Sequence, residues 1–191
     1  MTTINMISYI KMPDIIFHKI SWEQLEKDCL QLAKKLKNIK IDKIVAISRG
    51  GVIWARVLSD LLTIKVSHIT IESYQNLKAQ KEPVITEFPH QTLKYNTVLV
   101  VDEVSDTGKT FLRALSYFKN HNIKKIYTLA PYIKSHTKPL PDFWLYKIDA
   151  WFIYPYELKE TFNAFKKLFN KNAKEKMLDV GFKEWEIDSI F

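Results

Sequence analysis

Cysteine, arginine and glycine are scarce in this chain of 191 residues, and long apolar runs are missing. The single cysteine, Cys29, cannot form an intramolecular disulfide or a cysteine-rich metal cage, so we expect a reducing, cytoplasmic setting. The five histidines show no metal-ligand spacing, which argues against a transition-metal site. The most apolar run, residues 98–101, is far shorter than the roughly 18 residues of a membrane span. The sequence therefore predicts a soluble protein with no membrane partner.

The charge is strongly one-sided. The chain carries 29 lysines and arginines against 21 acidic residues, a formal net charge of +8 that favours anionic partners. Phosphorylated metabolites, nucleic acid and a membrane surface all satisfy that criterion. Because nearly all basic residues are lysines spread along the chain, they are more typical of a solvated surface than of an arginine-rich nucleic-acid face. We expect no nucleic-acid partner.

The few glycines are concentrated in two places. Of 4 glycines, Gly50 and Gly51 lie in Ser-Arg-Gly-Gly at 48–51, and Gly108 lies in Asp-Thr-Gly-Lys-Thr at 106–110. Average usage is about 7%, so each glycine here is expected where the backbone requires it. These two segments are the first candidates for a functional site.

Hydrophobic periodicity predicts an alternation of strands and helices. Helices are expected over 22–37, 53–62 and 108–119, and strands over 44–47, 66–71, 96–101, 125–130 and 148–154. The strands are apolar without strict alternation, which is typical of a mainly parallel sheet with helices on both faces. The hydrophobic fraction of 47% supplies a sizeable core. We therefore predict an α/β fold in one globular domain with an appendage.

Two segments differ from this pattern. Residues 75–82 are polar and precede Pro83, so we expect a long exposed loop that could act as a mobile lid. From Glu157 the chain becomes lysine-rich, with Leu158, Phe162, Phe165 and Phe169 at helical spacing. This predicts a helical C-terminal extension over 157–191. Its apolar stripe could pack on the core or on a second subunit, or lie on an anionic membrane.

The strand over 96–101 leads directly into polar residues. Asp102 and Glu103 follow it, and ligands of parallel sheets bind where strands end. Two adjacent carboxylates there can hold hydroxyl groups or Mg²⁺. The following Asp106-Thr-Gly-Lys-Thr110 combines backbone N–H groups, hydroxyls and a helix N-terminus, which predicts a phosphate cradle.

The string over 98–110, Val-Leu-Val-Val-Asp-Glu-Val-Ser-Asp-Thr-Gly-Lys-Thr, resembles the phosphoribosyl pyrophosphate signature of type I phosphoribosyltransferases. The resemblance implies that Asp102 and Glu103 bind the ribose and Mg²⁺. It implies further that Asp106 takes or orients the proton of a purine nitrogen. The expected 5′-phosphate loop comprises Ser105, Asp106, Thr107, Gly108, Lys109 and Thr110.

Residues 48–51 are similar to the pyrophosphate loop of xanthine-guanine type enzymes. Arg49 would contact pyrophosphate, while Ser48, Gly50 and Gly51 complete the loop; the family also implies a strained, sometimes cis, peptide there. Relatives often place an arginine in the segment that corresponds to 75–82. This chain has none there, so Lys78 or Lys81 would substitute as a flexible-loop charge.

The base-recognition segment also resembles that of purine phosphoribosyltransferases, especially short archaeal and bacterial members. Lys134 would donate to the exocyclic oxygen of a 6-oxopurine, and Trp151 and Phe152 would contact the ring. From the residues alone, spacing favours a core aromatic for Trp151 and a solvated surface lysine for Lys134.

The resemblance covers about 21–156 and implies the type I phosphoribosyltransferase fold with a small hood region, in a phosphoribosyltransferase domain over 1–156. The helical extension over 157–191 lies outside the resemblance. The implied reaction transfers phosphoribose from phosphoribosyl pyrophosphate to guanine, xanthine or hypoxanthine in purine salvage, with Mg²⁺ as cofactor. A homo-oligomer, dimer or tetramer, is expected. The alternatives are a non-catalytic regulator that binds phosphoribosyl pyrophosphate on the same fold, or a transferase for another base.

Overall fold

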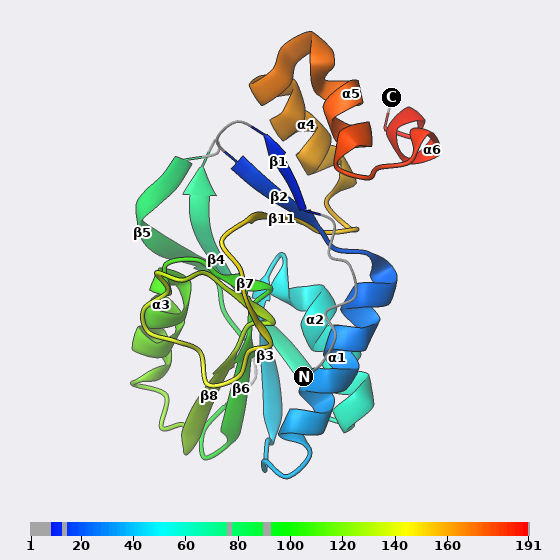
Figure 1. The fold of residues 1–191 in the computed structure, drawn as a ribbon. Helices are drawn as coiled ribbons and strands as arrows, with labels where there is room; N and C mark the ends of the chain where they lie inside the picture. Colours follow the sequence, from blue (N-terminus) through cyan, green and yellow to red (C-terminus); the bar gives the residue numbers. More distant parts are fainter. Residues whose placement is uncertain (1–8, 13–14, 76–77, 90–92, 191) are drawn as a thin grey trace. The chain divides into compact units, whose positions relative to one another are not determined.

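The computed structural model describes residues 9–12, 15–75, 78–89 and 93–190. The chain forms two compact units. Residues 25–148 make up one, and residues 1–24 together with 149–191 make up the other. Each unit is built around its own sheet, drawn in Figure 1. The C-terminal helices pack in the same unit as the N-terminal strands, so the two units do not divide the chain at 156–157. The boundary expected there stays a prediction.

The unit over 25–148 contains a five-stranded sheet with the order β5-β4-β3-β6-β8. Its strands are β3 (Lys43–Ser48), β4 (Val66–Gln75), β5 (Lys78–Glu87), β6 (Thr97–Val101) and β8 (Lys125–Leu129). The pairs β4–β3, β3–β6 and β6–β8 are parallel, and only β5 among these strands runs antiparallel. This confirms the predicted mainly parallel α/β fold.

Three helices accompany the sheet: α1 (Trp22–Leu36), α2 (Gly51–Leu62) and α3 (Lys109–Phe118). Figure 1 shows α1 and α2 beside one face and α3 beside the other. The apolar face of α3 buries Phe111, Ala114 and Phe118 against side chains of the parallel strands, which include Val98 and Val100. Burial of Phe111 alone contributes about 2 kcal/mol of hydrophobic stabilisation. Helical spacing of apolar residues therefore sets which face of α3 meets the sheet.

A small second sheet was not predicted from the sequence. It joins β7 (Val104–Ser105), β9 (Tyr132–Ile133) and β10 (Tyr146–Lys147) in parallel, in the order β10-β9-β7. Beneath it, the buried carboxylate of Asp28 accepts hydrogen bonds from the hydroxyls of Tyr132 at 2.5 Å and Tyr146 at 3.1 Å. Burial, followed by the Asp28 charge, raises the pKa of Tyr132. These bonds anchor β9, the strand that leads into Lys134.

The prediction of a long exposed loop over 75–82 is wrong. Strands β4 and β5 pair as an antiparallel hairpin in which Tyr74 lies opposite Ala79 and Gln75 opposite Lys78. Backbone pairing satisfies the N–H and C=O groups regardless of how polar the side chains are, which is why composition alone misjudged the segment. Lys78 and Lys81 therefore lie on a strand, and residues 76–77 fall outside the described part of the chain.

The second unit consists of a three-stranded sheet and the C-terminal helices. Strand β2 (Ile15–Lys19) pairs antiparallel with β1 (Tyr9–Met12) and parallel with β11 (Trp151–Ile153). The helices are α4 (Leu158–Phe169), η1 (Asn170–Asn172), α5 (Ala173–Asp179) and α6 (Glu184–Asp188). The expected helical extension is thus present, as several short helices.

The apolar stripe of the extension is buried within its own unit. Phe162 and Phe165 pack with Phe17 of β2 and Ile153 of β11, and the Phe17 and Phe165 ring centroids lie 5.0 Å apart. Packing on the strands, rather than on a membrane, is therefore the reading that the structure supports for this stripe. Among the described residues, no helix combines the length and apolar character that a membrane span requires.

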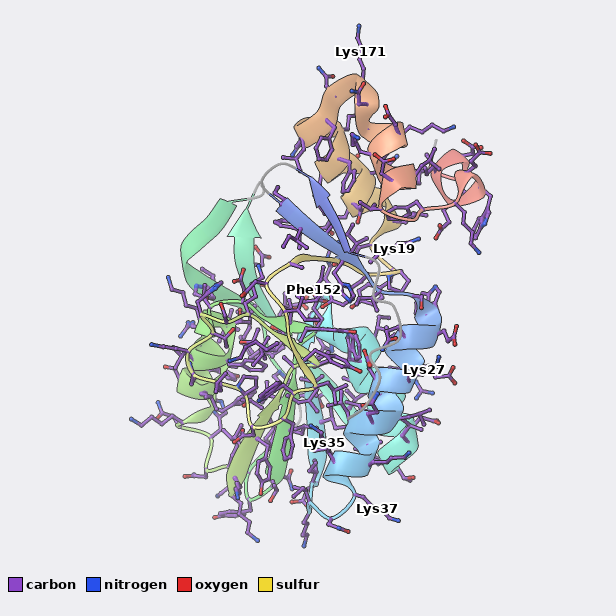
Figure 2. All side chains as sticks on the ribbon, viewed as in Figure 1. Lys19, Lys27, Lys35, Lys37, Phe152 and Lys171 are labelled. Atoms are coloured by element: carbon purple, nitrogen blue, oxygen red, sulfur yellow. The ribbon has the colours of Figure 1, made fainter. Side chains whose placement is uncertain are left out.

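Exposed lysines lie on the surface of both units. Figure 2 shows Lys27, Lys35 and Lys37 projecting from α1 and its C-terminal end, and Lys171 projecting from the tip of the C-terminal helices. Side chains of this kind keep their ammonium groups in water. These four exposed lysines agree with the solvated lysine surface that the sequence indicated.

Candidate active site

Two loops meet at the carboxyl edge of the parallel sheet. Strands β3 and β6 are neighbours, with Ala46 opposite Val101, so the residues that follow them lie side by side. Gly50 and Gly51 make this approach possible. A Cβ on Gly50 would overlap the Glu103 carboxylate, and one on Gly51 would overlap the Val101 carbonyl oxygen. Gly51 is required because backbone approaches it closely, whereas a side chain at position 50 would displace the Glu103 carboxylate.

The segment over 48–51 leads directly into α2. The Ser48–Arg49 peptide is cis, as the resemblance implied, and the Arg49 side chain is exposed. Helix α2 begins at Gly51 and carries no acidic residue in its first turn. The partial positive charge of its N-terminus is therefore not neutralised by an acid of that turn, and an anion placed there would be stabilised.

Asp102 and Glu103 lie immediately beyond β6. The Glu103 backbone N–H donates to the Asp102 carboxylate at 2.9 Å, and the Asp102 N–H donates to the Leu129 carbonyl at 2.9 Å, which fixes the backbone between β6 and β8. Desolvation raises the pKa of Asp102 to about 7, and the hydrogen bond from Glu103 only partly offsets it. This carboxylate is held in an environment with little compensating positive charge.

The second glycine segment forms a tight loop before α3. Gly108 has φ +84°, and a Cβ there would overlap the Lys138 carbonyl oxygen. The backbone N–H of Lys109 donates to the Thr107 hydroxyl at 3.4 Å. Like α2, α3 has no acidic residue in its first turn. The loop over 105–110 thus presents hydroxyls and a helix N-terminus, as a phosphate cradle requires. Ser105 is instead buried at the base of the loop.

The turn over 134–138 is fastened to this loop. The Lys134 N–H donates to the Ser105 carbonyl at 3.0 Å, and the Lys138 N–H donates to the Thr107 carbonyl at 3.2 Å. The buried Thr137 hydroxyl lies 2.5 Å from the Ser105 carbonyl oxygen and 2.6 Å from that of Asp106. We call residues 134–138 the base turn. Its hydrogen bonds fasten it to the phosphate loop at several points.

Asp106 is brought together with two basic side chains of the base turn. Its Oδ2 lies 3.1 Å from Lys134 Nζ, and its Oδ1 lies 2.7 Å from His136 Nε2. The sequence predicted roles for Asp106 and Lys134 but not their contact. It missed His136 and Thr137, because neither belongs to a recognised motif. The only available signal was their position directly after Lys134.

Trp151 and Phe152 belong to the other unit. Trp151 begins β11 and is exposed, whereas Phe152 is buried, with its ring 5.6 Å from that of His18 and stacked 6.3 Å from that of Tyr154. Both residues stay predictions as purine contacts. Lys78 and Lys81 likewise stay predictions as pyrophosphate contacts, now on a strand rather than a loop.

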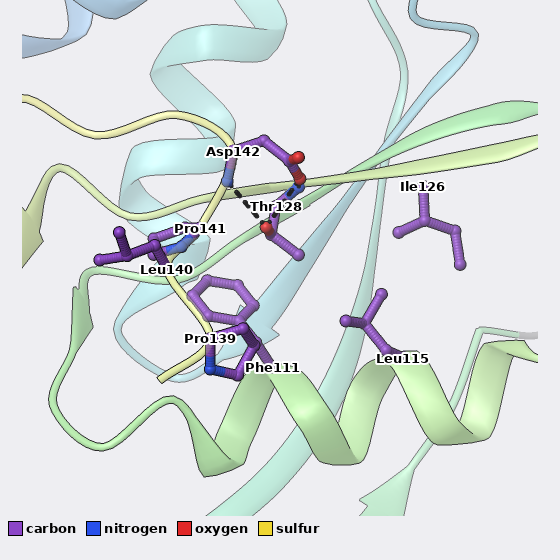
Figure 3. A pocket seen from close by; sticks show the side chains of 8 residues that line it. All are labelled: Phe111, Leu115, Ile126, Thr128, Pro139, Leu140, Pro141 and Asp142. Carbon is purple, nitrogen blue, oxygen red and sulfur yellow. Dashed lines mark hydrogen bonds between the residues drawn. The ribbon is translucent and has the colours of Figure 1, made fainter. Parts of the chain in front are cut away.

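A cavity of about 260 Å³ is lined in part by the residues that directly follow the phosphate loop and the base turn, Phe111 and Pro139 (Figure 3). Its lining residues are Phe111, Leu115, Ile126, Thr128, Pro139, Leu140, Pro141 and Asp142. The Asp142 carboxylate accepts hydrogen bonds from the Thr128 backbone N–H at 2.7 Å and from its hydroxyl at 2.9 Å. Asp142 thereby joins the 139–142 segment to β8. None of the lining residues belongs to the predicted site.

Comparison with known proteins identifies the family. The model of the phosphoribosyl transferase domain matches residues 21–161. The xanthine-guanine phosphoribosyltransferase of Cereibacter sphaeroides is 28% identical over 152 residues, which cover 74% of this chain and 87% of the relative. A solved purine phosphoribosyltransferase from Pyrococcus horikoshii has 33% identity and a TM-score of 0.67, covering 73% of this chain and 93% of that one.

A third similar protein is the xanthine-guanine-hypoxanthine phosphoribosyltransferase of Helicobacter pylori, with 27% identity and a TM-score of 0.65 over 79% of this chain and 99% of the relative. The matched region includes both site loops and the base turn. The chain belongs to the phosphoribosyltransferase family and, within it, to the purine phosphoribosyltransferases.

Proposed function

We propose that this protein transfers the 5-phosphoribosyl group of phosphoribosyl pyrophosphate to a ring nitrogen of a 6-oxopurine, with release of pyrophosphate. The observation that carries the proposal is the meeting of an acidic pair, two helix N-termini and the Asp106–Lys134 ion pair at one region of the unit over 25–148. Anionic substrate, sugar hydroxyls and a polar base each find complementary groups there.

The phosphate groups are assigned to the two glycine loops. Pyrophosphate would be held by Arg49 and by the backbone of Gly50 and Gly51 at the α2 N-terminus. The 5′-phosphate would be held by Thr107, Gly108, Lys109 and Thr110 at the α3 N-terminus. Because the two loops are rigidly joined to neighbouring strands, these contacts are formed with little reordering.

The acidic pair would bind the ribose hydroxyls and Mg²⁺. Among the described residues, no cluster of three or more His, Cys, Asp or Glu side chains could hold a metal by itself. Two adjacent carboxylates nevertheless fit Mg²⁺, which takes one or two protein carboxylates and completes its shell with water and substrate phosphate oxygens. When bound, Mg²⁺ supplies positive charge that stabilises the departing pyrophosphate.

The base turn would receive the purine. Lys134 would donate to the exocyclic oxygen of a 6-oxopurine, and Asp106 would accept the proton of a ring nitrogen as another ring nitrogen attacks the anomeric carbon. Positive charge that develops on the sugar as its bond to pyrophosphate breaks would be stabilised by Asp102 and Glu103. Trp151 and Phe152 would contact the ring, a role that rests on the resemblance.

The test is release of pyrophosphate from phosphoribosyl pyrophosphate and Mg²⁺, with guanine, hypoxanthine, xanthine and adenine supplied separately and a control without base. Release that depends on an oxopurine is expected. Release with adenine alone would overturn the 6-oxopurine assignment. Absence of release with every base, in protein that still binds phosphoribosyl pyrophosphate, would favour a non-catalytic regulator. We still expect the protein to act in the cytoplasm and to form a homo-oligomer.

The Asp106→Asn variant tests the role of Asp106 as the general base. It should lower kcat by about 100-fold or more, the usual range for loss of a general base, with a much smaller effect on the KM for phosphoribosyl pyrophosphate. Asp60→Asn is the matched control, because Asp60 is an exposed helical acid paired at 3.6 Å with Arg56. Unchanged turnover in Asp106→Asn would remove Asp106 from this role.

A further inference from the structure

The proposed function gives no role to His136, an ionisable side chain that contacts Asp106 at the site. Its Nε2 lies 2.7 Å from Asp106 Oδ1, while the opposite oxygen, Oδ2, lies 3.1 Å from Lys134 Nζ. Both oxygens of the carboxylate are therefore engaged by the base turn. The His136 side chain is 57% exposed, so the contact forms without burial of the imidazole.

Lys134 and His136, the two partners of the Asp106 carboxylate, have different roles in the proposed reaction. Lys134 is required at the exocyclic oxygen of the purine, and on moving there it leaves Oδ2 of Asp106. That oxygen becomes the one available to the ring N–H. The proposed function gives His136 no contact with the purine, so its Nε2–H donor continues to hold Oδ1. The carboxylate then keeps one orientation while its other oxygen accepts the proton.

The fold keeps His136 in reach of Asp106. The residue is flanked in sequence by Thr137, whose hydroxyl lies 2.6 Å from the Asp106 carbonyl oxygen. The Thr137 backbone N–H also donates to the Lys134 carbonyl at 3.2 Å, which closes the base turn. Because the turn is tied to the backbone of Asp106 itself, the imidazole and the carboxylate stay together although both are partly exposed to solvent.

We propose that His136 is a positioning residue for Asp106, which holds Oδ1 through a hydrogen bond from Nε2 and so directs Oδ2 at the purine ring proton. The proposal rests on the proposed function. The proton balance is simple: the ring nitrogen loses its proton to Oδ2, the carboxylate becomes a carboxylic acid, and His136 donates its hydrogen bond throughout. His136 exchanges no proton in this step.

The test compares His136→Ala and His136→Gln in the pyrophosphate-release assay. The alanine variant should lose kcat by about 10- to 100-fold, the range for a lost hydrogen bond to a charged group, with the KM for phosphoribosyl pyrophosphate changed less than about 2-fold. Glutamine carries an amide N–H near the place of Nε2, so it should restore kcat to within about 5-fold. His68→Ala is the control, since His68 is an exposed histidine 3.8 Å from the Glu87 carboxylate, outside the assigned site.

A second comparison separates positioning from general damage. In the Asp106→Asn background, His136→Ala should cause no further loss of kcat, because its effect passes through the carboxylate. Equal losses in the alanine and glutamine variants, an additive loss in the double variant, or a rise in KM without a fall in kcat would each overturn the proposal. Failure of the proposed function is distinguishable, because the wild-type protein would then release no pyrophosphate in response to a purine.

Discussion

The buried histidine of the second unit makes folding stability depend on pH in a defined way. His18 on β2 is 3% exposed and lies edge-on to Phe152, with ring centroids 5.6 Å apart. Burial lowers its pKa from 6.5 to about 4. The folded state therefore binds a proton more weakly than the unfolded chain. Stability is fully present above pH 6.5 and falls as the pH drops from there towards 4.

The magnitude follows from this interval. The full pKa difference corresponds to about 3 kcal/mol of unfolding free energy, of which about 2 kcal/mol is lost by pH 5. Other groups titrate in the same range, so the prediction concerns a difference between proteins. In His18→Gln the fall in unfolding free energy between pH 7.5 and pH 5 should be smaller than in the wild type by about 2 kcal/mol.

The assay is urea unfolding of both proteins at the two pH values, followed by circular dichroism. The change in packing caused by glutamine contributes equally at both pH values and cancels in the comparison. His121→Gln serves as the control, because His121 is exposed and its Nδ1 lies 2.9 Å from the Tyr117 carbonyl oxygen. An identical pH dependence in the wild type and His18→Gln would refute the argument that burial keeps this imidazole neutral.

Three further predictions concern a buried hydrogen bond, a loop glycine with positive φ and a core aromatic ring. Tyr132→Phe removes a donor from the buried Asp28 carboxylate and should lower the unfolding free energy by about 1.5–3 kcal/mol, measured by urea unfolding; a neutral result would mean that this hydrogen bond adds nothing. Gly108→Ala places a Cβ at φ +84° against the backbone of Lys138, so it should cost about 1–3 kcal/mol and weaken phosphoribosyl pyrophosphate binding in calorimetry; unchanged affinity would contradict the phosphate-loop assignment. Phe165→Ala should destabilise by about 3–5 kcal/mol, seen as a lower Tm, whereas an unaltered Tm would show that this ring is not part of a tight core.

Much of the larger unit was predictable from local sequence. The helices over 22–36, 51–62 and 109–118 and the buried strands between them follow from apolar spacing, which depends only on residues close together in the chain. The two glycine segments were equally readable. In a chain so poor in glycine, the three glycines of these segments marked places where backbone or a carboxylate approaches closely.

The errors and omissions arose where the structure depends on pairing or packing between segments rather than on periodicity within one segment. Polar residues 78–82 were expected in a loop, yet they extend a hairpin because a neighbouring strand offers backbone partners. Strands β7, β9 and β10 have only two residues each, which is too short for a hydrophobic periodicity to appear in the sequence. The C-terminal helices share a core with Phe17, more than a hundred residues earlier in the chain.

The sequence by itself determined the family and predicted an acidic pair, a phosphate loop and a lysine for the base, each encoded within a few consecutive residues. Only the tertiary structure decided that Asp106 shares its two carboxylate oxygens between Lys134 and His136. The physical reason is that such a contact depends on how β7 and β9 align side by side. Strand alignment is set by the packing of the whole unit and leaves no local signature in the chain.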